Sequence, residues 1–368
     1  MKATFLIQFL ALAVFASPVP QVETEESSVL TIRKHQLDKE IEAIRKDWNV
    51  NGLAVGIVHK GKLVYKQGFG TKDGGKGKVT EKTLFQIGSC TKAFTSFAIA
   101  QLVDEGKLDW NTPVTSVYPV KFADPVANAQ ASLIDILSHR SGFAEPGALF
   151  ISWSEWENVL SRIQDISAPV QLRQEFQYSN IMVALAGNIG GKVSGLKGGW
   201  DELVTRNIFG PIGMTSSFSN ARIVPSDSDY SQGFHSVDGK LQAYSLNDTY
   251  LTDSTKAAGS IVSNIEDLAK WVAVINKRGT LPNGTSLISP QQYGKLTKPH
   301  ISAEPAYYAE EFKSYGLGWF LASYRGKVNI GHGGSTPGYT TQIDTFPNDD
   351  LAIIVRLCFG KCTFQTHH

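Results

Sequence analysis

The chain has 368 residues, of which 42% are hydrophobic and 19% charged, and its formal net charge at pH 7 is +1. This balance is typical of a globular protein and excludes a disordered or fibrous chain. The small net charge argues against a nucleic-acid or acidic-surface partner, and the length fits either one large core or two lobes.

The N-terminal residues have the pattern of a secretion signal. Lys2 supplies a positive charge, and the apolar run that follows is too short to span a bilayer. Residues 1–16 therefore predict a signal peptide rather than a membrane anchor, followed by a flexible leader over 17–30. We expect a secreted protein that carries possible glycan acceptors at Asn247 and Asn283.

Apolar periodicity and turn residues predict the elements of the main domain, residues 31–368. A helix is expected over 36–48, then a β-hairpin over 53–65, then a helix from Ser89 to Glu105. Further helices are expected at 131–138, 156–164, 180–192, 199–208 and 265–276, and strands at 318–322, 327–331, 340–346 and 351–357.

Strands at both ends of the chain with helices between them predict an α/β (α+β) fold. We expect an antiparallel sheet that is built from both chain ends and flanked by helices, with a mainly helical inserted region. The α/β lobe would comprise residues 31–85 and 250–368, and the helical lobe residues 86–249. The sequence has no zinc-ligand spacing, calcium loop or phosphate loop, so no metal or organic cofactor is implied.

Ser89-Cys90-Thr91-Lys92 precedes a strongly apolar helical segment and follows Gly88, which permits a close turn. If Ser89 begins the helix, Lys92 lies about one turn on, on the same side. A serine hydroxyl needs a neighbouring base, and a desolvated lysine can act as one. The spacing alone is a weak signal, because Ser194 and Lys197 have it too, in a Gly-rich loop where we interpret it as chance.

Two later segments supply groups that suit acyl transfer. Tyr178-Ser179-Asn180 offers a phenol that can relay a proton and an amide that can contact substrate or orient Lys92. Gly331-His332-Gly333-Gly334-Ser335 lies in a predicted strand region whose small residues let a substrate lie against the edge. The backbone N–H groups of Ser335 and Ser89 would then form an oxyanion hole.

The order SxxK, YxN, HxG resembles that of the serine β-lactamase and penicillin-binding family. The similarity is to the branch of class C β-lactamases, D-aminopeptidases, D,D-carboxypeptidases and related esterases, and it extends over about residues 41–357. Other stretches also resemble segments of this family: the hairpin at 52–70, Leu137–Phe143, Ala257–Ser260 with Asp267-Leu268, and Tyr315–Trp319.

The resemblance implies a role for each motif residue. Ser89 is expected to be the nucleophile, Lys92 the base and Tyr178 the proton relay. Asn180 is expected to contact substrate, and His332 occupies the third-motif position, which Lys or His usually holds. The substrate-binding strand would add Gly333, Gly334 and Ser335, whose N–H falls at the family's oxyanion position.

Two other reactive side chains are interpreted as structural. His139 suggests a Ser-His-Asp triad, but the chain has no GxSxG elbow. Because Leu137–Phe143 resembles the family's LxHxSG segment, we interpret His139 as a structural, hydrogen-bonded histidine. Cys90 should point about 100° away from Ser89 on a helix. Cys358 and Cys362 are candidates for a disulfide, which their spacing alone does not establish.

The C-terminal end departs from the family pattern, because residues 358–368 show no helical periodicity where relatives have a further helix on the sheet. We therefore expect an uncovered apolar face on the sheet and interpret the end as truncated or mis-spliced.

The sequence thus predicts a secreted serine hydrolase that acts on an amide, ester or lactone through an acyl-enzyme. Its partner would be a small-molecule or short peptide substrate. Two alternatives remain: an acyltransferase that uses an alcohol or amine acceptor, and a non-catalytic binding protein that retains the fold.

Overall fold

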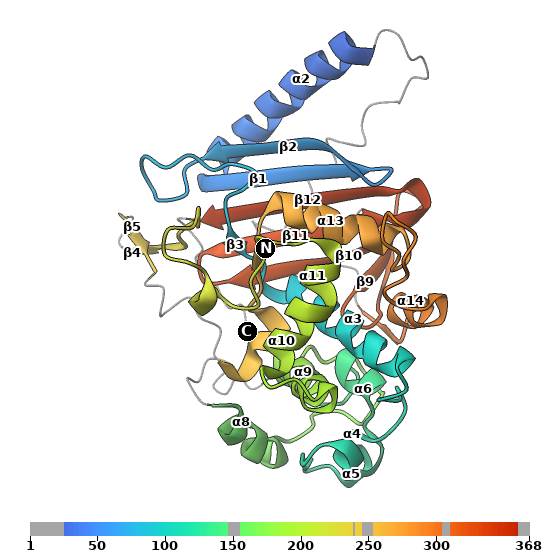
Figure 1. Cartoon of the computed structure of the whole chain (residues 1–368). Helices are drawn as coiled ribbons and strands as arrows, with labels where there is room; N and C mark the ends of the chain where they lie inside the picture. The colour runs from blue at the N-terminus through green and yellow to red at the C-terminus, as the bar shows by residue number, and fades with distance from the viewer. Residues whose placement is uncertain (1–25, 146–154, 238–239, 245–252, 304–309, 360–368) are drawn as a thin grey trace.

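The structure, a computed structural model, describes residues 26–145, 155–237, 240–244, 253–303 and 310–359. An antiparallel sheet crosses the upper half of the molecule in Figure 1, and most of the helices lie below it. The predicted signal peptide lies outside the described residues. Helix α2 (Glu26–Asp47) begins within the last residues of the predicted leader and projects above the sheet.

The main sheet is assembled from both ends of the described chain, as the sequence predicts. The hairpin formed by the first two strands pairs with the last strand, because β1 lies antiparallel to β12 as well as to β2. In spatial order the eight strands are β2 (Lys62–Gly70), β1 (Val50–His59), β12 (Leu351–Phe359), β11 (Tyr339–Phe346), β10 (Lys327–Thr336), β9 (Phe320–Tyr324), β8 (Glu310–Tyr315) and β7 (Ile301–Ser302).

Two small sheets accompany the main one. Strand β3 (Phe85–Gln86) pairs with β6 (Val262–Ser263), and β4 (Phe234–Val237) pairs with β5 (Lys240–Ala243). The β3–β6 pair ties the segment that leads into Ser89 to residues about 175 positions later in the chain, as the register Gln86↔Val262 shows.

Helix α3 (Thr91–Asp104) is the central helix, and every residue from Thr91 to Leu102 is buried. A helix that is enclosed on all sides needs packing partners on every face. The other helices are α4 (Val114–Val117), α5 (Pro125–Gln130), α6 (Leu133–Leu137), α8 (Trp156–Arg162), α9 (Asn180–Ser194), α10 (Gly199–Val204), α11 (Gly210–Ile212), α12 (Lys256–Gly259), α13 (Ile265–Asn276) and α14 (Pro290–Leu296).

Side-chain caps fix where two of the longer helices begin. The Ser179 hydroxyl accepts from the N–H of Met182 at the start of α9, and Gly195, with φ +72°, ends that helix. The Asn264 side chain likewise accepts from Asp267 N–H at the start of α13. Such caps satisfy the free N–H groups of the first turn, so the residues beside them are held in place.

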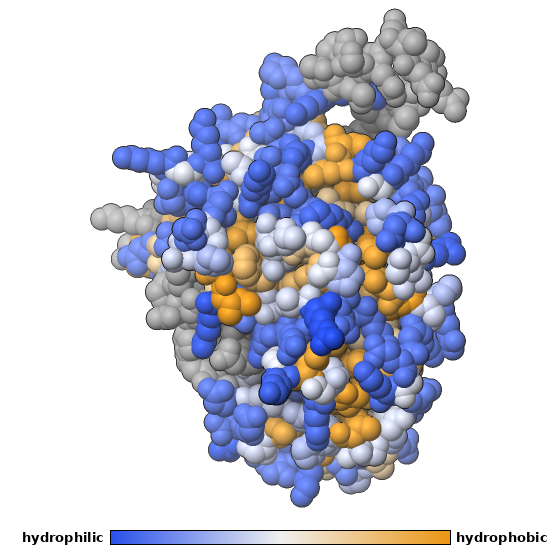
Figure 2. Space-filling view, viewed as in Figure 1, coloured by the Kyte–Doolittle hydropathy of each residue, from blue (hydrophilic) through white to orange (hydrophobic). Residues whose placement is uncertain are grey.

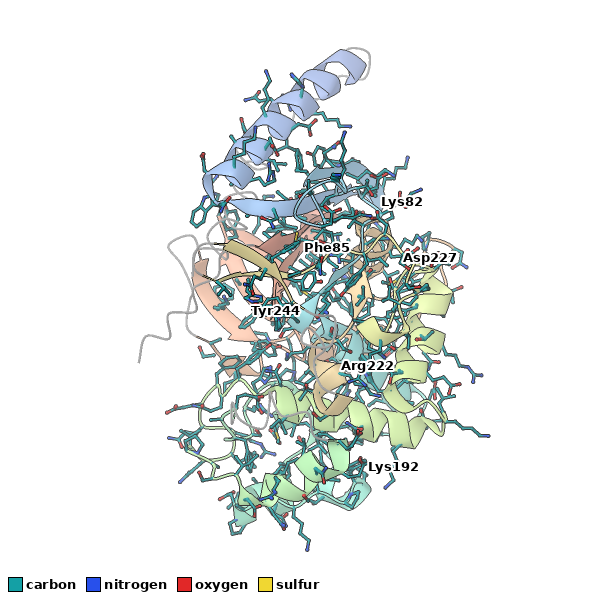
Figure 3. The ribbon with its side chains drawn as sticks, turned by 90° about the vertical axis from the view of Figure 1, so that its left-hand side faces the viewer. Lys82, Phe85, Lys192, Arg222, Asp227 and Tyr244 are labelled. Atoms are coloured by element: carbon teal, nitrogen blue, oxygen red, sulfur yellow. The ribbon has the colours of Figure 1, made fainter. Side chains whose placement is uncertain are left out.

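The core lies between the inner face of the sheet and the helices. Phe94 of α3 stacks on Trp271 of α13, with ring centroids 4.1 Å apart. Figure 3 shows Phe85 in the interior between the sheet and the helices, whereas Lys192 lies in the helical region below. Phe85 is fully buried and lies four residues before Ser89, so the segment that carries Ser89 is anchored in this core.

The outer face of β1 and β12 is not left uncovered, contrary to the expectation from the C-terminal sequence. Leu53 and Val55 of β1 are buried together with Ile353 and Val355 of β12. Ile41 of α2 belongs to the same buried cluster. The N-terminal helix therefore packs on this face.

The face of the molecule in Figure 2 is mostly hydrophilic, with apolar residues in several separate areas. Within the described ranges, no helix is both long and apolar enough to cross a membrane. Cys358 is a buried free thiol, and its suggested partner Cys362 lies outside the described residues, as does Asn247.

Candidate active site

Ser89 lies in a tight turn at the N-terminal end of the central helix. The turn Gly88–Cys90 is a short 3₁₀-helix that runs directly into α3 at Thr91. Gly88 has φ +52°, a left-handed conformation that costs glycine little. The Ser89 side chain stays partly exposed while both its neighbours are buried, so the turn presents its hydroxyl at the surface of the core.

Lys92 is fully buried and contacts three oxygen atoms. Its Nζ lies 2.9 Å from Ser89 Oγ, 2.5 Å from Asn180 Oδ1 and 2.9 Å from the carbonyl oxygen of Ala258. The SxxK spacing therefore places the amine on the same side of α3 as Ser89, as the sequence predicts.

These contacts suit a neutral lysine that accepts a proton from Ser89. The Asn180 and Ala258 oxygens can only accept, so they occupy the two N–H groups of a neutral amine. The nitrogen lone pair is then left for the Ser89 hydroxyl. Burial lowers the pKa of Lys92 to about 7, with Glu145 and Cys90 acting in the opposite direction, so the neutral form is accessible near physiological pH.

Tyr178 lies beside both groups. Its hydroxyl hydrogen-bonds the Ser89 side chain, and Lys92 Nζ lies 4.8 Å from the centroid of its ring. Burial raises the pKa of the Tyr178 phenol. Tyr178 therefore stays protonated at neutral pH, which suits a relay that donates a proton rather than a tyrosinate base.

His332 lies on β10 and is held by its neighbours as a neutral ring. Its Nδ1 lies 2.5 Å from the Gly333 carbonyl oxygen, and its Nε2 lies 2.8 Å from the Tyr315 hydroxyl. A ring that donates from Nδ1 can accept the Tyr315 O–H at Nε2. Burial lowers the pKa of His332 to about 3, so this third-motif residue is uncharged in the physiological range.

The second half of β10 passes against the turn that carries Ser89. Its pairing with β9 ends at Gly331, whereas its pairing with β11 continues to Thr336. A Cβ atom added to Gly88 would lie 2.6 Å from the Ser335 backbone nitrogen. The backbone nitrogens of Ser89 and Ser335 are thus brought to one place, where two N–H groups suit a developing oxyanion. Strand β10 extends beyond the predicted 327–331.

Gly334 is the residue at which this approach is tightest. A Cβ atom there would collide with the Ile87 carbonyl oxygen and lie 2.9 Å from the Ser89 nitrogen. A Cβ atom on Gly333 would meet only the end of the Gln342 side chain, at 3.0 Å.

We therefore expect Gly334→Ala to lower kcat/KM by about 10²-fold or more, the cost of losing an oxyanion donor. Gly294→Ala, the matched control on α14, should retain activity because an added Cβ atom there would have nothing within 4 Å. Steady-state kinetics and thermal melting of both variants provide the measurement. Wild-type activity in Gly334→Ala would show that the two nitrogens do not act together.

In the described part of the chain, the side chains interpreted as structural from the sequence form no hydrogen bond with Ser89 or Lys92. His139, at φ +60°, accepts the Ser179 N–H at Nδ1, and its ring packs at a tilt against the Tyr178 ring with centroids 4.3 Å apart, so it supports Tyr178. Cys90 directs its thiol to the His332 carbonyl oxygen, 3.1 Å away. The second SxxK pair does not form, because Ser194 donates to the Gly191 carbonyl oxygen and Lys197 is exposed.

Three contributors to the site were not singled out from the sequence. The Ala258 carbonyl oxygen and the Tyr315 hydroxyl come from stretches noted only for their family character. Glu145 had no signal in the sequence, since its proximity to Lys92 arises from packing. Among the described residues no cluster of three or more His, Cys, Asp or Glu side chains is arranged to hold a metal ion.

The family model and the similar proteins indicate the same family. A family model described as Beta-lactamase matches residues 37–357. The chain is 28% identical over 329 residues to an unguisins hydrolase of Aspergillus campestris, a match that covers 84% of this chain and 58% of that protein. It is 24% identical to penicillin-binding protein 4 of Amycolatopsis lactamdurans, over 87% of this chain and 81% of that protein.

A solved structure with a similar fold also comes from a penicillin-binding protein homologue. The octameric penicillin-binding protein homologue from Pyrococcus abyssi superposes with a TM-score of 0.79 and 26% identity, covering 88% of this chain and 73% of that one. Against the unguisins hydrolases, the chain spans less than two thirds of the relative's length.

Proposed function

The chain belongs to the beta-lactamase family, and on that premise we propose that it is a secreted serine hydrolase that acts through an acyl-enzyme on Ser89. The observation that carries the proposal is the position of Lys92, whose Nζ lies within hydrogen-bond distance of Ser89 Oγ, Asn180 Oδ1 and the Ala258 carbonyl oxygen. In the neutral amine, the two N–H groups can bond the Asn180 and Ala258 oxygens, which leaves the lone pair for Ser89.

In the proposed reaction Ser89 Oγ attacks the carbonyl carbon of an amide, ester or lactone. Its proton passes to Lys92 Nζ, and the carbonyl oxygen becomes an oxyanion that the backbone N–H groups of Ser89 and Ser335 stabilise. The C–N or C–O bond then breaks, and the leaving group takes a proton from Lys92 through Tyr178. Water attacks the acyl-enzyme with Lys92 again acting as base, which releases the acid and restores Ser89.

Two observations support the proposed substrate class. After Gly331, β10 has no ladder partner on its β9 side among the described residues, and a strand edge of this kind can pair with an extended backbone, which suits a peptide-like amide. Two relatives are named as unguisins hydrolases and another as penicillin-binding protein 4. An alcohol or amine that replaced water at the second step would give an acyltransferase instead.

Secretion is proposed from the N-terminal pattern of positive charge and apolar run. Asn283 lies in an exposed turn, which suits a glycan acceptor.

The test is covalent labelling of the purified protein. After incubation with fluorescent penicillin and with chromogenic esters, amides and lactones, we expect intact mass to rise by one acyl group, and peptide mapping to place it on Ser89. Release by water supports a hydrolase, and release that requires an added alcohol or amine supports an acyltransferase. A protein that neither labels nor turns over any substrate would be a binding protein that retains the fold.

The pH dependence of activity should follow Lys92. Because the base must be neutral and its pKa is about 7, kcat/KM for a neutral ester should rise through pH 7 to a plateau. His332, with a pKa of about 3, should add no inflection between pH 4 and 9. The measurement is kcat/KM across that range. A profile that is flat or that falls through pH 7 would exclude Lys92 as the base.

A further inference from the structure

Glu145 lies at the N-terminal end of α9, next to the site but outside the three motifs. Its Oε2 accepts from the backbone N–H of Asn180 at 2.6 Å and from that of Ile181 at 3.4 Å. Both N–H groups belong to the first turn of the helix, where a negative charge is stabilising. The other carboxylate oxygen, Oε1, is buried with no hydrogen-bond partner among the described residues.

This carboxylate is connected to Lys92 through a single residue. Asn180 is bound by Glu145 at its backbone nitrogen and by Lys92 at its side-chain Oδ1, 2.5 Å away. A shift of the first turn of α9 would therefore move the oxygen that orients the amine. The charge of Glu145 also acts directly on Lys92 and opposes the effect of burial.

Burial raises the pKa of Glu145, while the N–H groups of Asn180 and Ile181, the Ser179 side chain and Lys92 act to lower it. Glu145 is the one described carboxyl group whose charge acts on Lys92. Burial keeps the Cys90 thiol and the Tyr178 phenol protonated, since the pKa of each is raised. His139 and His332 are neutral, because burial lowers both pKa values. The remaining neighbours from the packed elements are uncharged oxygens, those of Ser89, Asn180 and Ala258.

We propose that Glu145 is a positioning residue for Lys92: it fixes the first turn of α9, so that Asn180 orients the amine, and its charge stabilises the protonated amine. The inference rests on the proposed role of Lys92 as the base. Glu145 would thus determine both how well the amine is aligned and the pH above which it is free to accept a proton.

The two effects separate in a pH profile. In Glu145→Gln the negative charge is gone, so the protonated amine loses a stabilising partner and the acid limb of kcat/KM should move to lower pH, by roughly half a unit or more. The plateau should also fall, because a neutral amide oxygen binds the Asn180 N–H less strongly than a carboxylate. If the substitution only loosened the packing around Lys92, the plateau of kcat/KM would fall and the pH of the acid limb would not change.

Two variants complete the comparison. Glu145→Asp keeps the charge but is one methylene shorter, so we expect a lower plateau with the acid limb close to wild type. Glu175→Gln removes an equal charge from an exposed side chain three residues before Tyr178, and both limb and plateau should stay unchanged. An acid limb that does not move in Glu145→Gln, or that moves to higher pH, overturns the proposal.

A second readout does not depend on turnover. In protein labelled with ¹⁵N-lysine, the Nζ resonance of Lys92, assigned with Lys92→Met, should titrate at lower pH in Glu145→Gln than in wild type. If Ser89 fails to label while this shift is present, the proposed function is wrong and the coupling between Glu145 and Lys92 stands. If Glu145→Gln does not fold, an Nζ resonance of Glu145→Asp that titrates at clearly lower pH than in wild type would overturn the role of the charge.

Discussion

Replacing Ser89 with alanine is expected to lower kcat/KM by about 10⁴-fold or more, the range seen when a covalent nucleophile is removed. The reason is chemical: without Oγ no acyl-enzyme forms, and Lys92, Tyr178 and the two backbone N–H groups have no nucleophile to activate. Covalent labelling by fluorescent penicillin should vanish together with turnover. The fold should persist, because the Ser89 side chain is partly exposed and alanine fits the turn.

The matched control for Ser89→Ala is Ser194→Ala, which alters the other SxxK sequence of the chain. The Ser194 hydroxyl donates to the Gly191 carbonyl oxygen and accepts from the Leu196 N–H at the end of α9, so its loss should leave kcat/KM within a few fold of wild type. Turnover that survives Ser89→Ala would overturn the mechanism for any substrate.

Replacing Lys92 with methionine is expected to lower kcat/KM by about 10³-fold or more, the contribution of a positioned general base. Methionine has a similar length and can occupy a buried apolar space, so cooperative melting should be retained. Lys92→Arg should be equally inactive, because a guanidinium stays protonated and offers no lone pair to Ser89. Acylation rates from single-turnover labelling provide the measurement, since they isolate the step in which Lys92 takes the proton.

Lys197→Met serves as the control for Lys92→Met. It removes an exposed lysine with the same SxxK spacing, and we expect no change in acylation rate. Activity in Lys92→Arg comparable to wild type would show that Lys92 supplies charge rather than a base.

Much of the fold was predictable because local patterns agree with it. Residues 265–276 were predicted as a helix and form α13, which begins at the Asn264 cap. The hairpin was predicted from a turn between two apolar runs, and Lys60 and Gly61 have the positive φ values that such a turn requires.

The elements that were missed carry weak local signals. Strand β8 has the sequence Glu-Glu-Phe-Lys-Ser-Tyr, which lacks the alternation of a half-buried strand, and pairing with β9 holds it. Helix α14 has only seven residues, too few for a clear apolar period. The C-terminal half of β10 was missed because glycines weaken strand propensity, yet its ladder with β11 continues through them.

The sequence by itself determined the opening hairpin, several of the longer helices, the assembly of the sheet from both chain ends and the order of the three motifs, because periodicity, turn residues and spacing are local properties. Only the tertiary structure decided which SxxK pair meets Tyr178, that Lys92 contacts Asn180 and Ala258, and that Glu145 lies behind them. The contacts of Glu145 with Asn180 and of Lys92 with Asn180 and Ala258 join residues 35, 88 and 166 positions apart, and such contacts depend on how the sheet and helices pack. Burial, likewise a property of the packed molecule, lowers the pKa of Lys92 to about 7, which is the property that the proposed role as a base requires.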